Sequence, residues 1–309
     1  MTMDSVLFIG AGRMGGLMAA RLADSGVPLA VADLSEEALA PFRERGLPVA
    51  AQAAGLPGSI VITMLPTDRH VRAALLGEGG ACTRLPREVV VDMSTAAPAS
   101  TLALAANLGG RGTAVLDAPV SGGMAGARAG TLTAMVGGAP DAFARVRPLF
   151  DRMCSEVIHV GPVGSGHVIK ALNNYLSAAT LWSATEALIV GERLGLDPEV
   201  MLKVWSAGSG KSHATEVKLP NHVLTGTYDF GQTLELFCKD ISIAADLARR
   251  AEAQTPTLEA LLAFWSAARD RLGGQEDITA IARLIGNSRL GGEAMLAVAP
   301  EEAQAKAER

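Results

Sequence analysis

The sequence is poor in cysteine, and its few cysteines are spread along the chain. The 309 residues include only three, Cys82, Cys154 and Cys238, an odd number with wide spacing. This pattern favours neither a disulfide framework nor a zinc site, and it is typical of proteins in a reducing compartment. We therefore expect a cytoplasmic protein that binds no metal, with its thiols buried as small hydrophobic side chains.

Aromatic residues, basic clusters and long apolar runs are also scarce. Aromatic side chains make up 4% of the residues, the net charge is −5, and no group of Lys and Arg stands out, which argues against a nucleic-acid partner. No apolar run approaches the roughly 20 residues of a membrane-spanning helix. The first residues pass directly into an apolar segment without a basic region, so we predict neither a signal peptide nor a membrane partner.

Glycine and alanine, by contrast, are abundant, and the first glycine cluster follows a predicted strand. Residues 6–9 are apolar and end at glycine, as a buried parallel strand does. Residues 14–25 have apolar side chains near helical spacing and are followed by Gly26, a typical helix stop. Residues 29–32 form a second apolar run that ends at Asp33. This is a strand–helix–strand unit with glycines at its first turn.

The turn reads Gly10-Ala11-Gly12-Arg13-Met14-Gly15 and has the glycine spacing of a dinucleotide-binding motif. Gly10 permits the tight turn, Gly12 lets the backbone approach the pyrophosphate, and Gly15 allows close helix-to-strand packing. The N-terminus of the following helix offers free N–H groups to the phosphates. We expect these six residues to bind a dinucleotide.

Asp33 bears on the choice of dinucleotide. A carboxylate at the end of the second strand accepts hydrogen bonds from the adenosine ribose and repels a 2′-phosphate. No arginine follows directly, so NAD is favoured over NADP. Asp33 is also compatible with a purely structural role in a turn or helix cap, although Ser35 is the better candidate for the cap.

Strands and helices continue to alternate up to about residue 160, with strands predicted at residues 59–65, 89–92, 114–116, 132–136 and 157–160. Such alternation implies an open, mostly parallel sheet whose ligand crevice lies at the carboxyl ends of the strands. Three loops fall at such ends, namely Met64-Leu65-Pro66, Ser94-Thr95 and Ser121-Gly122-Gly123. Each serine loop alone is as typical of a capped turn as of a binding loop. Because both are expected at the same edge of the sheet, binding of a carboxylate or of the nicotinamide end is favoured.

From about Gly164 the sequence predicts helices only, near residues 167–195, 198–206, 234–254, 256–271 and 277–285. The predicted fold class is therefore α/β, with two domains joined by a long interdomain helix. A Rossmann-type doubly wound domain spans residues 1–163, and an all-helical domain for substrate binding and oligomerisation spans residues 164–309.

Lys170 and Asn174 are four residues apart near the start of the long helix, so they share one helical face. A solvated surface pair is the plain alternative. The glycine-rich entry at 164–166 and the apolar neighbours instead favour a partly desolvated lysine. Desolvation lowers the pKa of an amine and suits it to proton transfer.

These motifs together resemble the β-hydroxyacid dehydrogenase family, which includes 3-hydroxyisobutyrate dehydrogenase and tartronate semialdehyde reductase. The resemblance covers nearly the whole chain. It rests on Phe8-Ile-Gly10-Ala-Gly12-Arg-Met-Gly15, Met64-Leu-Pro66, Asp92-Met-Ser-Thr95, Asp117-Ala-Pro-Val-Ser-Gly-Gly123, Gly130-Thr-Leu132, Gly164-x-Gly166-x-x-x-Lys170-x-x-Asn-Asn174 and Lys239-Asp240.

The resemblance implies a role for each matching residue. Lys170 is the expected catalytic acid/base, and Asn174 orients the substrate. The substrate-binding residues are expected to be Ser121, Gly122, Gly123, Thr95 and Lys239. Besides the glycine motif and Asp33, the cofactor is expected to contact Met64, Leu65, Pro66, Thr95, Lys239 and Asp240. Hydride then passes between the nicotinamide and the carbon that bears the hydroxyl group.

The resemblance implies an NAD-dependent dehydrogenase of a small 3-hydroxy acid such as 3-hydroxyisobutyrate. Tartronate semialdehyde reduction and oxidation of a sugar acid such as threonate stay open, because Gln232 stands where many relatives have an aromatic residue. An imine reductase or a non-catalytic dinucleotide-binding protein is less favoured, since both generally lack the equivalent of Lys170.

Assembly and the C-terminus are predicted from weaker signals. The Ala- and Leu-rich long helix and the family resemblance favour a homodimer or homotetramer. Residues 291–309 are rich in Ala, Glu and Lys and are expected to form a frayed helix or a disordered tail.

Overall fold

The computed structural model describes residues 4–286, so the tail predicted at 291–309 lies outside the described residues. The described chain forms two compact units. Unit 1 contains residues 4–176 together with Leu236–Leu262, and unit 2 contains Ser177–Glu235 together with residues 263–286. The domain boundary expected after residue 163 stays a prediction.

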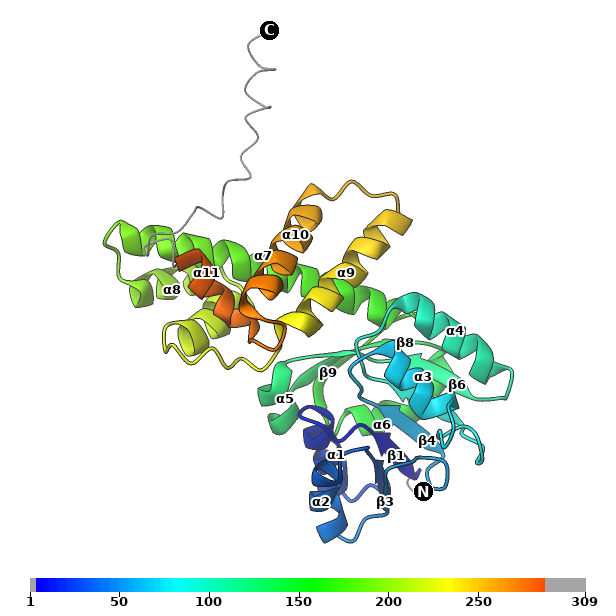
Figure 1. Cartoon of the computed structure of the whole chain (residues 1–309). Coiled ribbons are helices and arrows are strands. Elements are labelled where there is room, and N and C mark those ends of the chain that lie inside the picture. The colour runs from blue at the N-terminus through cyan, green and yellow to red at the C-terminus, as the bar shows by residue number, and fades with distance from the viewer. Residues whose placement is uncertain (1–3, 287–309) are drawn as a thin grey trace. The chain divides into compact units, whose positions relative to one another are not determined.

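Unit 1 is built on one nine-stranded sheet with the strand order β3-β2-β1-β4-β5-β6-β8-β7, and β9 pairs with β8. Figure 1 labels β1, β3, β4, β6, β8 and β9 of this sheet. The strands are β1 Val6–Ile9, β2 Leu29–Ala32, β3 Val49–Ala50, β4 Ile60–Thr63, β5 Val89–Asp92, β6 Ala114–Asp117, β7 Val120–Ser121, β8 Leu132–Gly137 and β9 Cys154–Gly161. All pairings are parallel except those of β8 with β6 and β7. The predicted doubly wound, mostly parallel sheet is confirmed; the two-residue strands β3 and β7 were not expected from the sequence.

Helices cover both faces of this sheet. Phe8 of β1 packs in a core with α1 (Gly15–Asp24), α2 (Glu36–Glu44) and α6 (Pro140–Phe150). Its neighbour Leu7 packs in a second core with α3 (Asp68–Leu76) and α4 (Pro98–Gly109). Successive side chains of a strand point to opposite faces, and apolar residues at both positions therefore require two covering layers.

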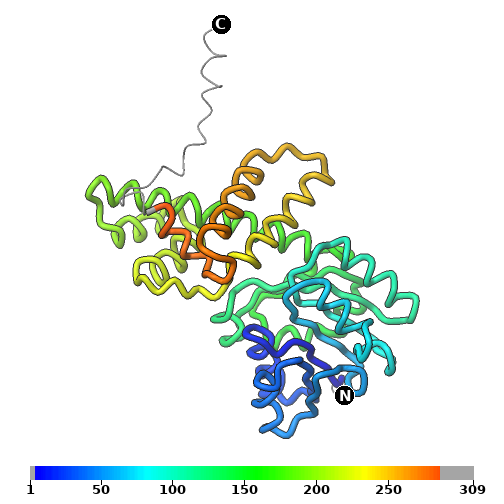
Figure 2. The backbone as a smooth tube through the Cα atoms, viewed as in Figure 1, coloured from blue at the N-terminus to red at the C-terminus, as the bar shows by residue number. Residues whose placement is uncertain are grey.

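Five parallel strands end in register at one edge of the sheet. Ile9 pairs with Ala32 and Thr63, Thr63 pairs with Asp92, and Asp92 pairs with Asp117. The loops that follow these residues therefore lie next to one another. Figure 2 shows the course of the backbone through this unit. This is the edge at which parallel sheets bind their ligands.

Beyond β9 the described residues contain helices and one isolated bridge, between Thr233 and Asp277. The helices are α7 Ser165–Arg193, α8 Pro198–Ala207, the π-helix η1 Ala214–Val223, α9 Leu234–Arg250, α10 Pro256–Leu272, the 3₁₀ turn η2 Ile278–Ala280 and α11 Ile281–Gly286. The predicted all-helical C-terminal part is confirmed, except that η1 was not foreseen. None of the helices described is both long and apolar enough to cross a membrane.

Candidate active site

The turn between β1 and α1 contains three glycines, and the fold itself requires two of them. Gly10 has a φ of +99°, and a Cβ there would collide with the carbonyl oxygen of Met64. A Cβ at Gly15 would collide with the carbonyl of Gly10, whereas a Cβ at Gly12 would meet nothing within 4 Å. Packing within the chain thus explains Gly10 and Gly15 only. The open space at Gly12 fits a pyrophosphate that must approach the backbone closely.

The N-terminus of α1 is suited to an anion. Within the described residues no side chain caps its first turn, and that turn holds no acidic residue. Gly12 and Arg13 are exposed, Met14 at the N-cap position is half-buried, and Ala11 is buried. Unpaired N–H groups and the helix dipole attract phosphate at such an end. The predicted glycine motif therefore has the local geometry of a dinucleotide-binding turn.

Asp33 is held at the end of β2 by two backbone N–H groups. Ala11 N donates to its Oδ2 at 2.6 Å, and Ser35 N donates to its Oδ1 at 2.8 Å. The side chain is half-buried, beside the glycine turn. The helix cap is supplied instead by Ser35, whose Oγ accepts a hydrogen bond from Ala38 N at 3.2 Å.

A hydrogen bond joins the loops after β4 and β5. Ser94 is 1% exposed, and its Oγ accepts a hydrogen bond from Leu65 N at 2.9 Å. The hydroxyl of Ser94 is thus part of the protein interior, and Thr95 is the half-buried residue of this pair. Met64 and Leu65 are half-buried and Pro66 is exposed, so the loop presents surface toward solvent.

The segment Ser121-Gly122-Gly123 joins β7 to α5 (Gly123–Ala129). Gly122 has a φ of +126° and Gly123 a φ of +62°, conformations that side-chain-bearing residues rarely adopt. Ser121 is half-buried and Gly122 is exposed, and within the described chain no side chain caps α5. The loop therefore offers a hydroxyl and unobstructed backbone N–H groups, which are suitable donors for a carboxylate.

Four predicted site residues meet where α7 and α9 lie side by side within unit 1. Asn174 Nδ2 donates a hydrogen bond to Asp240 Oδ2 at 2.7 Å. Lys239 Nζ donates to the carbonyl oxygens of Thr95 at 2.8 Å and Pro66 at 3.2 Å. Lys170 is half-buried, and among residues 4–286 its ammonium group makes no hydrogen bond or ion pair. The structure therefore joins these α7 and α9 residues to the loops after β4 and β5.

The electrostatics of this cluster suit proton transfer. Burial lowers the pKa of Lys170 from its ordinary 10.5, Lys239 lowers it further, and Asp240 opposes the shift. Burial raises the pKa of Asp240, against the opposing effect of the two lysines and Asn174. Asp240 Oδ1 lies 3.3 Å from Lys239 Nζ, an ion pair without hydrogen-bond geometry. Lys170 is consequently an amine that can change its protonation state at lower pH than an ordinary lysine.

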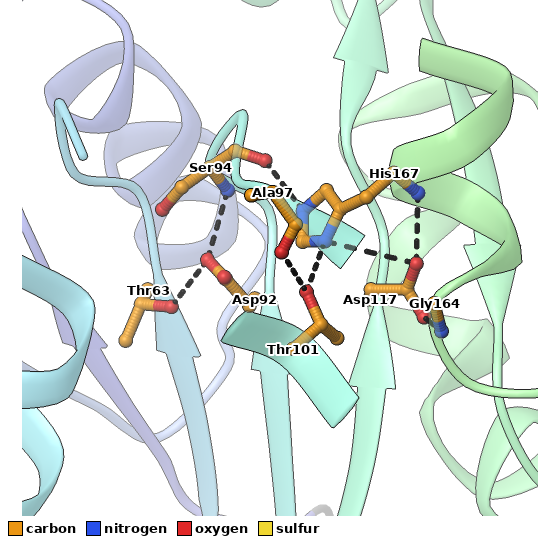
Figure 3. A network of polar contacts seen from close by, with 8 residues as sticks. All are labelled: Thr63, Asp92, Ser94, Ala97, Thr101, Asp117, Gly164 and His167. Carbon is orange, nitrogen blue, oxygen red and sulfur yellow. Dashed lines mark hydrogen bonds and ion pairs between the residues drawn. The ribbon is translucent and has the colours of Figure 1, made fainter. Parts of the chain in front are cut away.

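Sequence reasoning missed two buried residues next to this cluster, His167 and Asp117. Asp117 Oδ1 accepts a hydrogen bond from Gly164 N at 2.6 Å, and Oδ2 accepts one from His167 N at 2.8 Å, so that the carboxylate caps the start of α7 (Figure 3). The His167 ring bonds to Ser94 and Thr101. A histidine among apolar neighbours carries no local signal of such partners, because they come from distant strands.

Two family models match the chain over almost all described residues. Residues 5–161 match the NAD-binding domain of 6-phosphogluconate dehydrogenase. Residues 164–285 match the domain described as the NAD-binding domain of NADP-dependent 3-hydroxyisobutyrate dehydrogenase.

Curated relatives share a third of their sequence with this chain. A 2-(hydroxymethyl)glutarate dehydrogenase of Eubacterium barkeri is 33% identical over 280 residues, which are 90% of this chain and 93% of the relative. A 3-sulfolactaldehyde reductase of Escherichia coli is 36% identical over 283 residues, 90% of this chain and 95% of that protein. The chain belongs to the β-hydroxyacid dehydrogenase family.

A solved structure of 3-hydroxyisobutyrate dehydrogenase from Mycobacterium tuberculosis with L-serine agrees with this assignment. It is 27% identical, has a TM-score of 0.82, and covers 92% of this chain and 99% of its own. The expected family and fold are thereby confirmed. As a member of this family, the protein is an NAD(P)-dependent hydroxyacid dehydrogenase, an oxidoreductase that acts on CH–OH groups.

Proposed function

We propose that the protein transfers hydride between NAD and a small 3-hydroxy acid of the 3-hydroxyisobutyrate type, with Lys170 as the acid/base. The observation that carries this proposal is the state of Lys170, a half-buried ammonium group with no bonding partner among the described residues and a lowered pKa. A lysine with these properties can move a proton at a pH where an ordinary lysine stays protonated.

The chemistry divides between cofactor and protein. When bound, the nicotinamide supplies the hydride acceptor or donor. Lys170 Nζ takes the proton from the substrate hydroxyl in oxidation and returns it to the carbonyl oxygen in reduction. Asn174 donates a hydrogen bond to the same oxygen, and its amide is held in one orientation by Asp240 Oδ2. Correct placement of these groups contributes much of the rate.

The substrate carboxylate is proposed to bind at Ser121, Gly122 and Gly123, through the Ser121 hydroxyl and the backbone N–H groups. Thr95 and Lys239 complete the substrate site. Lys239 Nζ is already held by the carbonyls of Thr95 and Pro66, which places a positive charge at this loop. A positive charge here favours an anionic substrate.

The proposed cofactor contacts are the glycine motif of residues 10–15, Asp33, the loop from Met64 through Leu65 to Pro66, Thr95, Lys239 and Asp240. NAD is proposed over NADP because the carboxylate of Asp33 is fixed beside the glycine turn and would repel a 2′-phosphate. One family model that matches the chain is described as NADP-dependent. Both cofactors must therefore be compared directly.

Among substrates, 3-hydroxyisobutyrate is the first candidate, because a matching family model and matching structures carry that name. A more polar substrate such as tartronate semialdehyde or threonate is the second candidate. The polar residue Gln232, at a sequence position where many relatives have an aromatic residue, supports it.

We further propose a cytoplasmic homodimer or homotetramer. Large apolar side chains near the end of α7 and on α8 are exposed, with values of 58% for Val190, 76% for Leu194 and 61% for Val204. Exposed apolar surface of this kind is typical of a subunit interface. Sedimentation analysis would test the assembly, and a monomer at micromolar concentration would contradict it.

The substrate proposal is tested by turnover. Small 3-hydroxy acids, including 3-hydroxyisobutyrate, L-serine and threonate, are each offered with NAD and with NADP, and reduced nicotinamide is followed by its absorbance. The reverse reaction is assayed with tartronate semialdehyde and reduced cofactor. We expect the highest kcat/KM for a three- or four-carbon 3-hydroxy acid with NAD. Activity confined to substrates without a carboxylate would refute the proposal.

A further inference from the structure

His167 has no place in the proposed chemistry, yet both nitrogens of its ring have hydrogen-bond partners. Its side chain is fully buried. Nε2 lies 2.9 Å from the carbonyl oxygen of Ser94, and Nδ1 lies 2.7 Å from Thr101 Oγ1. Figure 3 shows the ring between the loop that carries Ser94 and the carboxylate of Asp117.

The partner of Nε2 assigns one hydrogen atom of the ring. A carbonyl oxygen only accepts, so Nε2 must carry a hydrogen and donate it to Ser94. Nδ1 bonds to the hydroxyl of Thr101, which also lies 3.4 Å from the carbonyl oxygen of Ala97, a second acceptor for its single hydrogen. The ring thus donates a bond from α7 to the loop after β5 and makes a second bond to Thr101 of α4.

This loop and this helix carry most of the proposed catalytic residues. Lys170 follows His167 by three residues on α7, about one helical turn. On the loop, Thr95 follows Ser94 directly, and its carbonyl accepts the hydrogen bond of Lys239 Nζ. The bond between His167 and Ser94 therefore connects the helix that carries Lys170 to the loop that carries Thr95. The proposed reaction depends on the relative position of these two segments.

A second pair of bonds fixes the same helix turn to the sheet. Both oxygens of Asp117, the last residue of β6, accept backbone N–H groups, one from Gly164 just before α7 and one from His167 in its first turn. These bonds hold the position of the helix end but do not reach the loop after β5. Among the described side chains at the start of α7, only His167 makes a hydrogen bond to Ser94.

We propose that His167 is a positioning residue, whose bond to Ser94 sets the place of the Lys170 ammonium relative to the loop at Thr95. The inference rests on the proposed function of Lys170. The reason is geometric, because a displacement of about 1 Å at a reacting group can reduce the rate roughly 100-fold. A bond made by a fully buried ring limits such displacement.

Two conservative variants test the roles of the two ring nitrogens separately. In His167→Gln the side-chain amide N–H reaches to about the place of Nε2 and can still donate to Ser94. In His167→Asn the shorter side chain reaches only to about the place of Nδ1, so the bond to Ser94 is lost. His159→Asn is the matched control, because His159 Nε2 lies 2.8 Å from the carbonyl oxygen of Gly138, elsewhere in the same unit.

The first measurement is steady-state turnover over a range of pH, with the best substrate of the wild-type enzyme. We expect kcat to fall by about 10- to 100-fold in His167→Asn, with the Kd for NADH nearly unchanged and the inflection of the pH profile displaced. His167→Gln should recover at least half of the logarithmic loss, and His159→Asn should match wild type. A purely structural role would lower the amount of folded enzyme and leave the pH profile in place.

The second measurement needs no substrate, so it separates this inference from the proposed function. The labelling rate of Lys170 by an amine-reactive reagent is followed against pH by mass spectrometry of the peptide that contains Lys170, after digestion of the labelled protein. Because burial lowers the pKa of Lys170, loosening of the helix start should move the labelling inflection to higher pH in His167→Asn. Asp240 and Lys239, which also act on Lys170, are unchanged in every variant.

The outcomes are distinct. A displaced labelling inflection in His167→Asn, restored in His167→Gln and absent in His159→Asn, supports the positioning role even if the substrate proposal is wrong. An unchanged inflection and an unchanged pH profile in folded His167→Asn overturn it. Equal behaviour of the two His167 variants also overturns it, because the bond to Ser94 would then be irrelevant.

Discussion

Two buried aspartates near α7 stand in opposite situations. Asp117 is fully buried, and both of its oxygens accept backbone N–H groups at 2.6 and 2.8 Å. Asp240 is 3% exposed; its Oδ2 accepts one hydrogen bond from Asn174, whereas Oδ1 has only an ion pair with Lys239. Both oxygens of Asp117 thus have hydrogen-bond donors, whereas Oδ1 of Asp240 has none in the described chain.

The difference in hydrogen bonding between Asp117 and Asp240 distinguishes a residue that supports the fold from one that serves the reaction. A buried polar group with every bond made stabilises one arrangement, whereas a partly satisfied group is costly and is kept where a ligand or a reaction needs it. The region around Asp117 and His167 is of the first kind. The region around Asp240 and Lys170 is of the second kind, since it includes an ammonium group that bonds to nothing in the described chain.

The largest expected effect is that of Lys170→Ala. Removal of the acid/base should lower kcat by about 1,000-fold, within the range measured for general acid–base groups. The Kd for NADH, followed by fluorescence titration, should change little, because the glycine turn is untouched. Lys203→Ala, on the exposed face of α8, serves as the control and should keep wild-type turnover. Wild-type kcat in Lys170→Ala would contradict the mechanism.

Asp117→Ala should act on stability. It leaves the N–H groups of Gly164 and His167 buried without an acceptor, so the free energy of unfolding should fall by about 3 kcal/mol. Denaturant unfolding measures this loss. Asp151→Ala is the control, because the exposed Asp151–Arg147 ion pair is expected to contribute less than about 1 kcal/mol. Equal losses in the two variants would mean that the Asp117 carboxylate is not the support described here.

Asp240→Asn should lower activity rather than stability, the reverse of Asp117→Ala. The amide can still accept a hydrogen bond from Asn174, and it removes a charge whose burial is unfavourable, so unfolding stability should be kept or should rise. The kcat should fall by about 10-fold, because the charge that orients Asn174 and pairs with Lys239 is lost. Thermal unfolding and steady-state kinetics on one preparation check both parts. A large loss of unfolding stability with normal kcat would mean that Asp240, like Asp117, has a structural role only.

Asp33 extends the comparison to a third carboxylate, which like Asp117 accepts two backbone N–H groups but is only half-buried. In Asp33→Asn the amide oxygen can still accept from Ala11 N, while the charge is gone. The ratio of kcat/KM for NAD to that for NADP should fall by about 10-fold. Glu37→Gln, an exposed residue at the start of α2, is the control. An unchanged ratio would show that Asp33 does not select the cofactor.

The smallest effect is a displacement of the pH profile. Oxidation needs the neutral amine of Lys170, so kcat for oxidation should rise with pH through an inflection below 10.5, the ordinary lysine value. Reduction needs the ammonium form and should be lost through the same range. Because Asp240 raises the pKa of Lys170, the inflection in Asp240→Asn should move to lower pH. A move to higher pH would contradict the electrostatic account.

Local signals in the sequence were sufficient for much of the fold. The apolar runs of β1, β2, β4 and β5 and the turn at Gly10 were predictable, because the periodicity and the glycine chemistry are contained in a few neighbouring residues. The π-helix η1 and the two-residue strands β3 and β7 were not, since their hydrogen bonds depend on surrounding segments. For the site, proximity in the helix was enough to join Lys170 to Asn174.

The sequence by itself determined which chemical groups this protein has and in what order, including the glycine turn, the lysine of α7 and the lysine–aspartate pair of α9. Only the tertiary structure decided which of the carboxylates are satisfied, that the Ser94 hydroxyl faces inward, and that His167 connects α7 to the loop after β5. The physical reason is that burial and hydrogen bonding depend on partners far apart in the chain, such as Ser94 and His167, and these meet only when the sheet and its helices have packed.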